Sequence, residues 1–93
     1  MNDLVREKIN NFVERSPDYI DGVTNVNDRH RLYDIIMAVH ETNESVVDTK
    51  EELSNAIATS SKFMYADHVI ADCMTALDTI PMFLDYYSYK YQN

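Results

Sequence analysis

The stretch that decides the fold is residues 3–15, which read Asp3-Leu4-Val5-Arg6-Glu7-Lys8-Ile9-Asn10-Asn11-Phe12-Val13-Glu14-Arg15. Its apolar side chains recur every three or four residues, which places them on one stripe of an α-helix. Asn2 or Asp3 can cap the start of this helix, and Ser16-Pro17 ends it because the residue before a proline avoids the α region. The stretch therefore predicts an amphipathic helix that buries one face.

The residues that break helices are rare in the rest of the chain. There is one glycine, Gly22, and there are two prolines, Pro17 and Pro81. So few glycines and prolines are typical of a helical protein. The segment from Asp18 to Asn27 is expected to be a loop, and Tyr19 to Val26 is the one stretch compatible with a short strand.

Three or four further helices are expected. Asn27 can cap a second helix that runs to about Glu41. Its inward-facing residues are expected to be Leu32, Ile35, Ile36 and Val39. The sequence Thr49-Lys50-Glu51-Glu52 has the pattern of a capping box and predicts the start of a third helix. Thr59-Ser60-Ser61 is expected to end it.

The last third of the chain predicts a fourth helix and a shorter final one. The fourth helix is expected to begin near Lys62, with its inner side formed by Tyr65, Val69, Cys73, Met74 and Leu77. Pro81 fits the first position of a last helix that runs toward Tyr89. We therefore expect an all-α or nearly all-α fold: one domain over residues 1–93, built as a small bundle of four to five helices with an acidic face.

Composition limits where the protein works. The chain has 93 residues, 45% of them hydrophobic, which is enough for one packed core. It has no apolar run long enough to span a bilayer, and the acids near its N-terminus do not resemble a signal peptide. A single cysteine, Cys73, gives no disulfide framework and favours a reducing compartment. We expect a cytoplasmic protein, in the host cytoplasm if a phage encodes it.

The charge balance points to the kind of partner. Sixteen acids oppose eight bases, which gives a net charge of −8. A chain of this charge is repelled by nucleic acid and attracted to basic surfaces. Charge of this size also serves solubility alone, so the distribution of the acids has to decide between the two interpretations.

The acids occur in long stretches that contain no Lys or Arg. One such stretch runs from Asp34 to Asp48, and another lies between Lys62 and Lys90. Acids five to seven residues apart on a helix are separated by about 7.5–10.5 Å of rise, comparable with the spacing of phosphates along DNA. The alternative is that these acids form only the solvent-exposed face of amphipathic helices. The candidate protein-binding acids are Asp34, Glu41, Glu44, Asp48, Glu51, Glu52, Asp67, Asp72, Asp78 and Asp85.

No motif for catalysis or cofactor binding is found. One glycine cannot form a nucleotide loop, and His40-Glu41-Thr42-Asn43-Glu44 lacks the second histidine of a zinc-protease helix. Asp18 to Gly22 lacks the ligands of a calcium loop and is expected to be a turn. Cys73 falls on an inward stripe, where a thiol is a small apolar group. We expect no catalytic residue, no metal and no cofactor; the rival hypothesis is a minor enzyme that uses Asp67, His68 or Cys73.

The C-terminal region is rich in tyrosine. Tyr86-Tyr87-Ser88-Tyr89-Lys90-Tyr91 follows Phe83 and Leu84, and these residues can either seal the core or form an interface. The alternative function is therefore a small phage regulatory adaptor that binds a host protein, such as RNA polymerase, through this tyrosine-rich surface.

The size, the helical texture and the unpaired Asp and Glu runs together resemble the DNA-mimic antirestriction proteins of phages, in particular the T4-type proteins that act against the McrBC endonuclease. A gapped local similarity to the T7-type mimics joins Asp48-Thr49, Glu52-Leu53, Ala56-Ile57 and Tyr65-Ala66-Asp67. The resemblance implies an inhibitor that occupies the DNA site of a host protein, either a restriction nuclease such as McrBC or a histone-like nucleoid protein. It also implies a homodimer.

Overall fold

The computed structural model of the chain describes residues 1–20 and 25–79, and 79% of these residues are helical. Four helices follow one another in this part: α1 Asp3–Arg15, α2 Val26–Thr42, α3 Val46–Ser60 and α4 Ala66–Thr79. No strand occurs among the described residues, so the all-α bundle expected from the sequence is confirmed. Over the same ranges, no helix combines the length and the apolar character needed to cross a bilayer. The expected helix after Pro81 lies outside the described residues.

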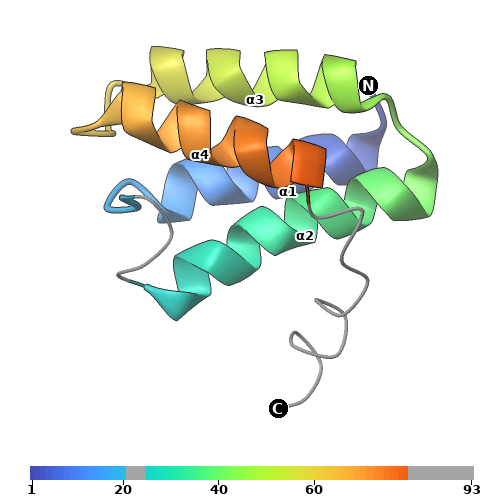
Figure 1. Ribbon diagram of the computed structural model, residues 1–93, viewed down its shortest axis with the longest axis horizontal. Helices are drawn as coiled ribbons and strands as arrows, with labels where there is room; N and C mark the ends of the chain where they lie inside the picture. Colours follow the sequence, from blue (N-terminus) through green and yellow to red (C-terminus); the bar gives the residue numbers. More distant parts are fainter. Residues whose placement is uncertain (21–24, 80–93) are drawn as a thin grey trace.

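The helices pack around one apolar core. α1 packs against α2 and α3, and α3 packs against α4. Figure 1 shows α3 and α4 along one side of the molecule and α1 and α2 along the other. Burial of each large core side chain stabilises the fold by about 1.5–3 kcal/mol relative to leaving that side chain exposed. The core residues from the helices include Val5, Ile9, Phe12, Leu32, Ile35, Ile36, Val39, Leu53, Ile57, Val69, Cys73 and Leu77.

α1 forms as the sequence predicts. The side chain of Asn2 accepts the backbone N–H of Leu4 at 2.8 Å and so caps the first turn. At the other end, Ser16 donates its backbone N–H to the carbonyl of Phe12. Ser16 is fully buried, and its hydroxyl accepts a hydrogen bond from Arg31 of α2.

α2 begins two residues earlier than expected. Its cap is Asn25, whose backbone is extended and whose side chain accepts the N–H groups of Asn27 and Asp28. Asn27 is therefore a residue of the first turn and not the cap. The helix ends where Asn43 takes the left-handed conformation, with φ of 58°. Asparagine tolerates this conformation better than most residues, which explains the stop.

The expected start of α3 at Thr49 is wrong. The cap is Ser45, whose hydroxyl accepts the N–H of Asp48 at 3.2 Å. Thr49 lies one turn into the helix, is fully buried, and donates its hydroxyl to the carbonyl of Ser45 at 2.8 Å. The sequence Ser45-Val46-Val47-Asp48 has the same cap-like spacing as Thr49-Lys50-Glu51-Glu52, and the earlier serine initiates the helix because Thr49 is needed in the core.

α3 ends at Ser60, as expected, but α4 begins at Ala66 and not near Lys62. The connection between them is pulled toward the core by Phe63, which is 8% exposed and stacks on Phe12 with ring centroids 6.2 Å apart. The inner side of α4 is formed by Val69, Cys73 and Leu77. Tyr65, expected on that side, precedes the helix and is 47% exposed.

Candidate functional site

The candidate acids on α4 do not share one face. Successive residues of an α-helix are rotated by about 100°, so Asp67 and Asp78, eleven residues apart, lie nearly in line, while Asp72 points about 120–140° away from both. Asp72 accepts a hydrogen bond from the hydroxyl of Tyr19 and is half-buried. The side chain of Asp78 forms an ion pair with Lys50 of α3 at 2.9 Å. Of these three acids, only Asp67 is exposed and forms no ion pair with another described residue.

Glu44 serves the local structure. Its carboxylate accepts the backbone N–H of Asn2 at 2.6 Å and that of Ser45 at 3.1 Å. These two hydrogen bonds, the one from Asn2 first, lower the pKa of Glu44. Glu44 thereby joins the beginning of α1 to the beginning of α3.

The two candidate acids on α2 differ in exposure. Asp34 is half-buried and has an interaction partner, whereas Glu41 is exposed near the end of the helix. They are seven residues apart and therefore lie on nearly the same side of α2. Asp85 lies outside the described residues, as does the tyrosine-rich segment from Tyr86 to Tyr91.

The three candidate acids on α3 do lie together. Asp48 and Glu51 are exposed on the side of α3 opposite Leu53. Glu52 is half-buried beside α1, where its Oε1 atom lies 3.7 Å from Nε of Arg6. A shallow hollow is lined by all three, together with Met1, Arg6 and Asn55. The surface between α1 and α3 is thus acidic on its α3 side.

α1 adds three acids that sequence reasoning missed. Asp3, Glu7 and Glu14 are all exposed, and spacings of four and seven residues put them on one line directly opposite the buried Val5, Ile9 and Phe12. The helical periodicity that predicted the core stripe could also have found this line. Stretches without Lys or Arg do not indicate this line, because α1 also contains Arg6, Lys8 and Arg15.

We define the α1–α3 acidic surface as the outward faces of these two packed helices. Its carboxylates are Asp3, Glu7, Glu14, Asp48, Glu51 and Glu52. Within the described part of the chain, the one ion pair on this surface joins Arg6 and Glu52, whose side chains are both partly exposed. Arg15 lies at one end of it, and Lys50 is directed to Asp78 on α4. The other five carboxylates form no ion pair among the described residues, and Arg6 and Arg15 line the same shallow hollow as Asp3, Glu7 and Glu14.

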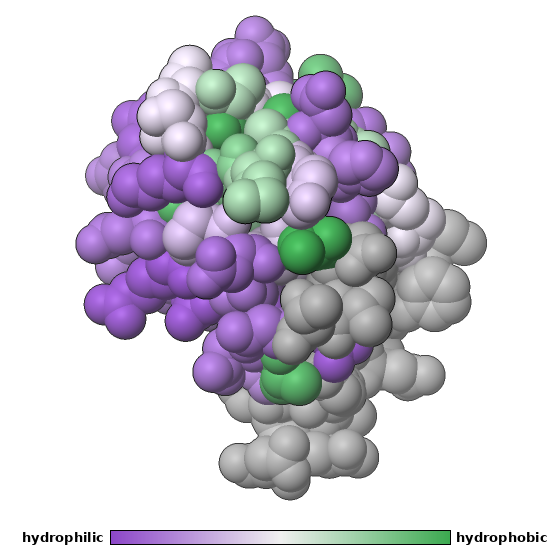
Figure 2. Space-filling model, turned by 90° about the vertical axis from the view of Figure 1, so that its left-hand side faces the viewer, coloured by the Kyte–Doolittle hydropathy of each residue, from purple (hydrophilic) through white to green (hydrophobic). Residues whose placement is uncertain are grey.

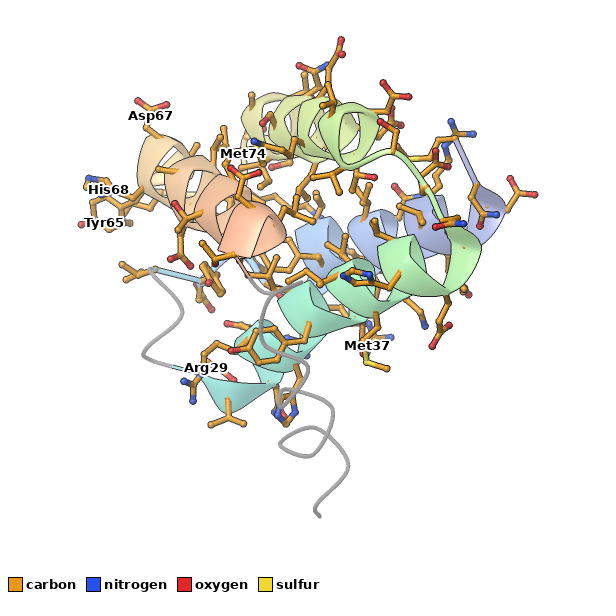
Figure 3. The ribbon with its side chains drawn as sticks, turned by 45° about the vertical axis from the view of Figure 1, so that its right-hand side comes forward. Arg29, Met37, Tyr65, Asp67, His68 and Met74 are labelled. Carbon is orange, nitrogen blue, oxygen red and sulfur yellow. The ribbon has the colours of Figure 1, made fainter. Side chains whose placement is uncertain are left out.

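The residues considered for catalysis do not converge. Cys73 is fully buried, and this burial raises the pKa of its thiol, which disfavours the thiolate that a nucleophile requires. Figure 3 shows Tyr65, Asp67 and His68 projecting outward at the beginning of α4. The ring of His68 meets the ring of Tyr65 edge-on, with centroids 6.2 Å apart. Across residues 1–20 and 25–79, no three His, Cys, Asp or Glu side chains are placed to hold a metal ion.

The fold and the surface define a small all-α protein with an acidic face. Comparison of the chain with protein-family models, with curated proteins and with solved structures finds no match.

Proposed function

We propose that this protein is a DNA mimic: it binds the DNA-contacting surface of another protein through the α1–α3 acidic surface and excludes DNA by competition. In this proposal it acts by binding and not by catalysis. The observation that carries the proposal is the line of unpaired acids along α1 together with the exposed acids of α3, the helix packed against it. Two rigid, adjoining helices hold these charges in fixed positions, so they can face a lysine- and arginine-lined channel without being ordered first.

The spacing of the acids supports the same function. Asp3 and Glu7 are separated by about 6 Å of helix rise, and Glu7 and Glu14 by about 10.5 Å. Asp48 and Glu51 are separated by about 4.5 Å on the neighbouring helix. Negative charges in two rows on neighbouring helices resemble what a basic protein surface meets on a nucleic-acid duplex. The proposed partners are a restriction nuclease such as McrBC or a histone-like nucleoid protein, and a homodimer of this chain would lengthen the rows.

The net charge explains why such a protein would not itself bind DNA. At −8 it is repelled by phosphates, whereas the basic site of a DNA-binding protein attracts it. The interaction would consist of many weak, screened contacts. It should therefore be tolerant of single substitutions and sensitive to collective ones.

Displacement of DNA tests the proposal. A fluorescent duplex is bound to McrBC or to a histone-like nucleoid protein, and the wild-type protein is titrated in. We expect the wild-type protein to displace duplexes of any sequence. The double variant Glu7→Lys/Glu51→Lys should displace them at least about tenfold more weakly, because its lysines then face the lysines and arginines of the partner. Both positions are exposed and unpaired among the described residues, so the fold should persist.

The matched control changes the same amount of charge elsewhere. Glu41→Lys/Asp67→Lys reverses two exposed acids on α2 and α4, outside the α1–α3 acidic surface. This control should displace the duplex nearly as well as the wild type. Equal losses in both double variants would mean that net charge acts without a defined surface. If neither the wild type nor the variants displace the duplex, DNA mimicry toward these two targets is rejected.

A further inference from the structure

A second surface feature lies at the end of the bundle where α1 ends and α4 begins. Residues 16–20 and the connection 61–65 meet there and enclose a hollow of about 150 Å³. A volume of this size holds a group as large as a benzene ring. The hollow is lined by Pro17, Asp18, Tyr19, Ile20, Met64 and Tyr65.

The floor of this hollow is rigid because it belongs to the core. Tyr19 is 3% exposed, and its ring packs edge-on against Phe12 with centroids 5.4 Å apart. Its hydroxyl is fixed by donation to Asp72. On the other side, Phe63 is buried against Phe12 and anchors the connection that carries Met64. The floor of the hollow is therefore held in place by the core.

The rim of the hollow is apolar and open to solvent. Met64 is 82% exposed, Tyr65 is 47% exposed and Ile20 is 39% exposed. Figure 2 looks onto this end of the bundle and shows apolar side chains at its centre, with hydrophilic side chains gathered to the left. A flexible methionine beside an aromatic ring is a combination that proteins use on binding surfaces, because methionine adapts to differently shaped partners.

Charge decides which occupant fits. Asp18 is the one charged residue among the described residues that line the hollow. Arg15 at the end of α1 and Lys62 in the connection are also exposed near this end, so the attraction of a basic segment rests on Asp18 and on the net charge of −8. A second copy of this chain, also carrying −8, would bring like charge to Asp18, so the proposed homodimer would form away from this end of the molecule. A positively charged segment would be attracted to it.

We propose that this hollow binds a bulky apolar side chain flanked by lysine or arginine in a partner protein. The requirement for lysine or arginine beside the apolar side chain rests on the proposed function, since the same partner would lie along the α1–α3 acidic surface. The insertion of an apolar side chain does not rest on the proposed function, because it follows from the hollow alone. The partner would then be recognised by charge along the helices and by one inserted side chain at the end of the bundle.

Three capped pentapeptides test the inference by NMR titration of the labelled full chain. The first has leucine between two pairs of lysines, the second has serine in place of leucine, and the third has leucine between two pairs of glutamates. We expect the first to shift the signals of Ile20, Met64 and Tyr65, and to bind at least about tenfold more tightly there than the second, as burial of a leucine side chain allows.

Variants of exposed residues separate the hollow from the acidic surface. Met64→Ser should remove the advantage of leucine over serine, while Val47→Ser, which alters a side chain 73% exposed on α3, should leave it unchanged. Equal binding of the first two peptides, or shifts confined to α1 and α3, would overturn the hollow and leave DNA mimicry standing. Equal binding of the glutamate peptide would overturn the requirement for a basic flank. Shifts at the hollow that grow with protein concentration alone would assign it to a second copy.

Discussion

Arg6 on α1 and Glu52 on α3 form an ion pair across the boundary of the two helices, with Nε and Oε1 3.7 Å apart. Both side chains are nearly half-exposed, at 49% and 43%. An ion pair in contact with water stabilises a fold by about 0–1 kcal/mol at most. Arg6 therefore matters less for stability than for the charge of the α1–α3 acidic surface, where it is a base among carboxylates.

Replacing Arg6 should strengthen binding to a basic partner. Arg6→Gln removes a positive charge from the surface and frees the carboxylate of Glu52, so we expect tighter binding to a DNA-binding target. The free energy of unfolding, measured by urea titration, should change by no more than about 1 kcal/mol. A weaker complex from a variant of unchanged stability would show that Arg6 contacts the partner directly.

The stability of the protein should depend on pH through Glu44. The pKa of this residue is lowered by hydrogen bonds to its carboxylate, so the stabilisation is present above the ordinary value of 4.5 and is lost as the pH falls from there through the lowered pKa. Thermal melts between neutral pH and pH 3 should show a smaller loss of stability for Glu44→Gln than for the wild type. Glu41→Gln, at an exposed position near the end of α2, is the control and should follow the wild-type curve.

The start of α3 can be tested with hydroxyl deletions. Ser45→Ala should cost about 1 kcal/mol because the N–H of Asp48 loses its acceptor. Thr59→Ala removes an exposed hydroxyl that only bonds back to α3 carbonyls, and it should leave stability nearly unchanged. If urea unfolding gives the same small change for both variants, Ser45 does not cap the helix.

Asp72 should behave as a structural residue. Asp72→Lys leaves the hydroxyl of the buried Tyr19 without its acceptor, and we expect a destabilisation of about 1–3 kcal/mol. Asp67→Lys, on the same helix but exposed, should be tolerated. The comparison uses unfolding by urea, and equal stability of the two variants would contradict the assigned role of Asp72.

The fold could be read from the sequence more fully than the site. Helical periodicity predicted α1, and the breaks at Ser16-Pro17 and at Ser60 follow from local chemistry that needs no tertiary contact. The start of α3 was misplaced because two cap-like patterns overlap, and the choice between them depends on whether Thr49 is buried. The start of α4 was misplaced because Phe63 packs on Phe12, 51 residues earlier in the chain.

The acidic surface required the packing of the helices. Spacing along the chain suggested that Asp67, Asp72 and Asp78 act together. However, Asp72 accepts a hydrogen bond from Tyr19, and Asp78 forms an ion pair with Lys50 of α3. The acids of α1 and of α3 belong to one surface only because these two helices pack together, with Arg6 between the two groups. Sequence reasoning about single stretches cannot find a surface that two helices share.

The most direct measurement of the central claim is the salt dependence of the dissociation constant for McrBC or a histone-like nucleoid protein, with wild type and Glu7→Lys/Glu51→Lys compared. A surface of solvated carboxylates that faces lysine and arginine is screened by salt, so the wild-type affinity should fall steeply between about 50 and 200 mM salt. The double variant should bind more weakly and show a shallower slope. An affinity that is the same in both proteins and indifferent to salt would contradict the account.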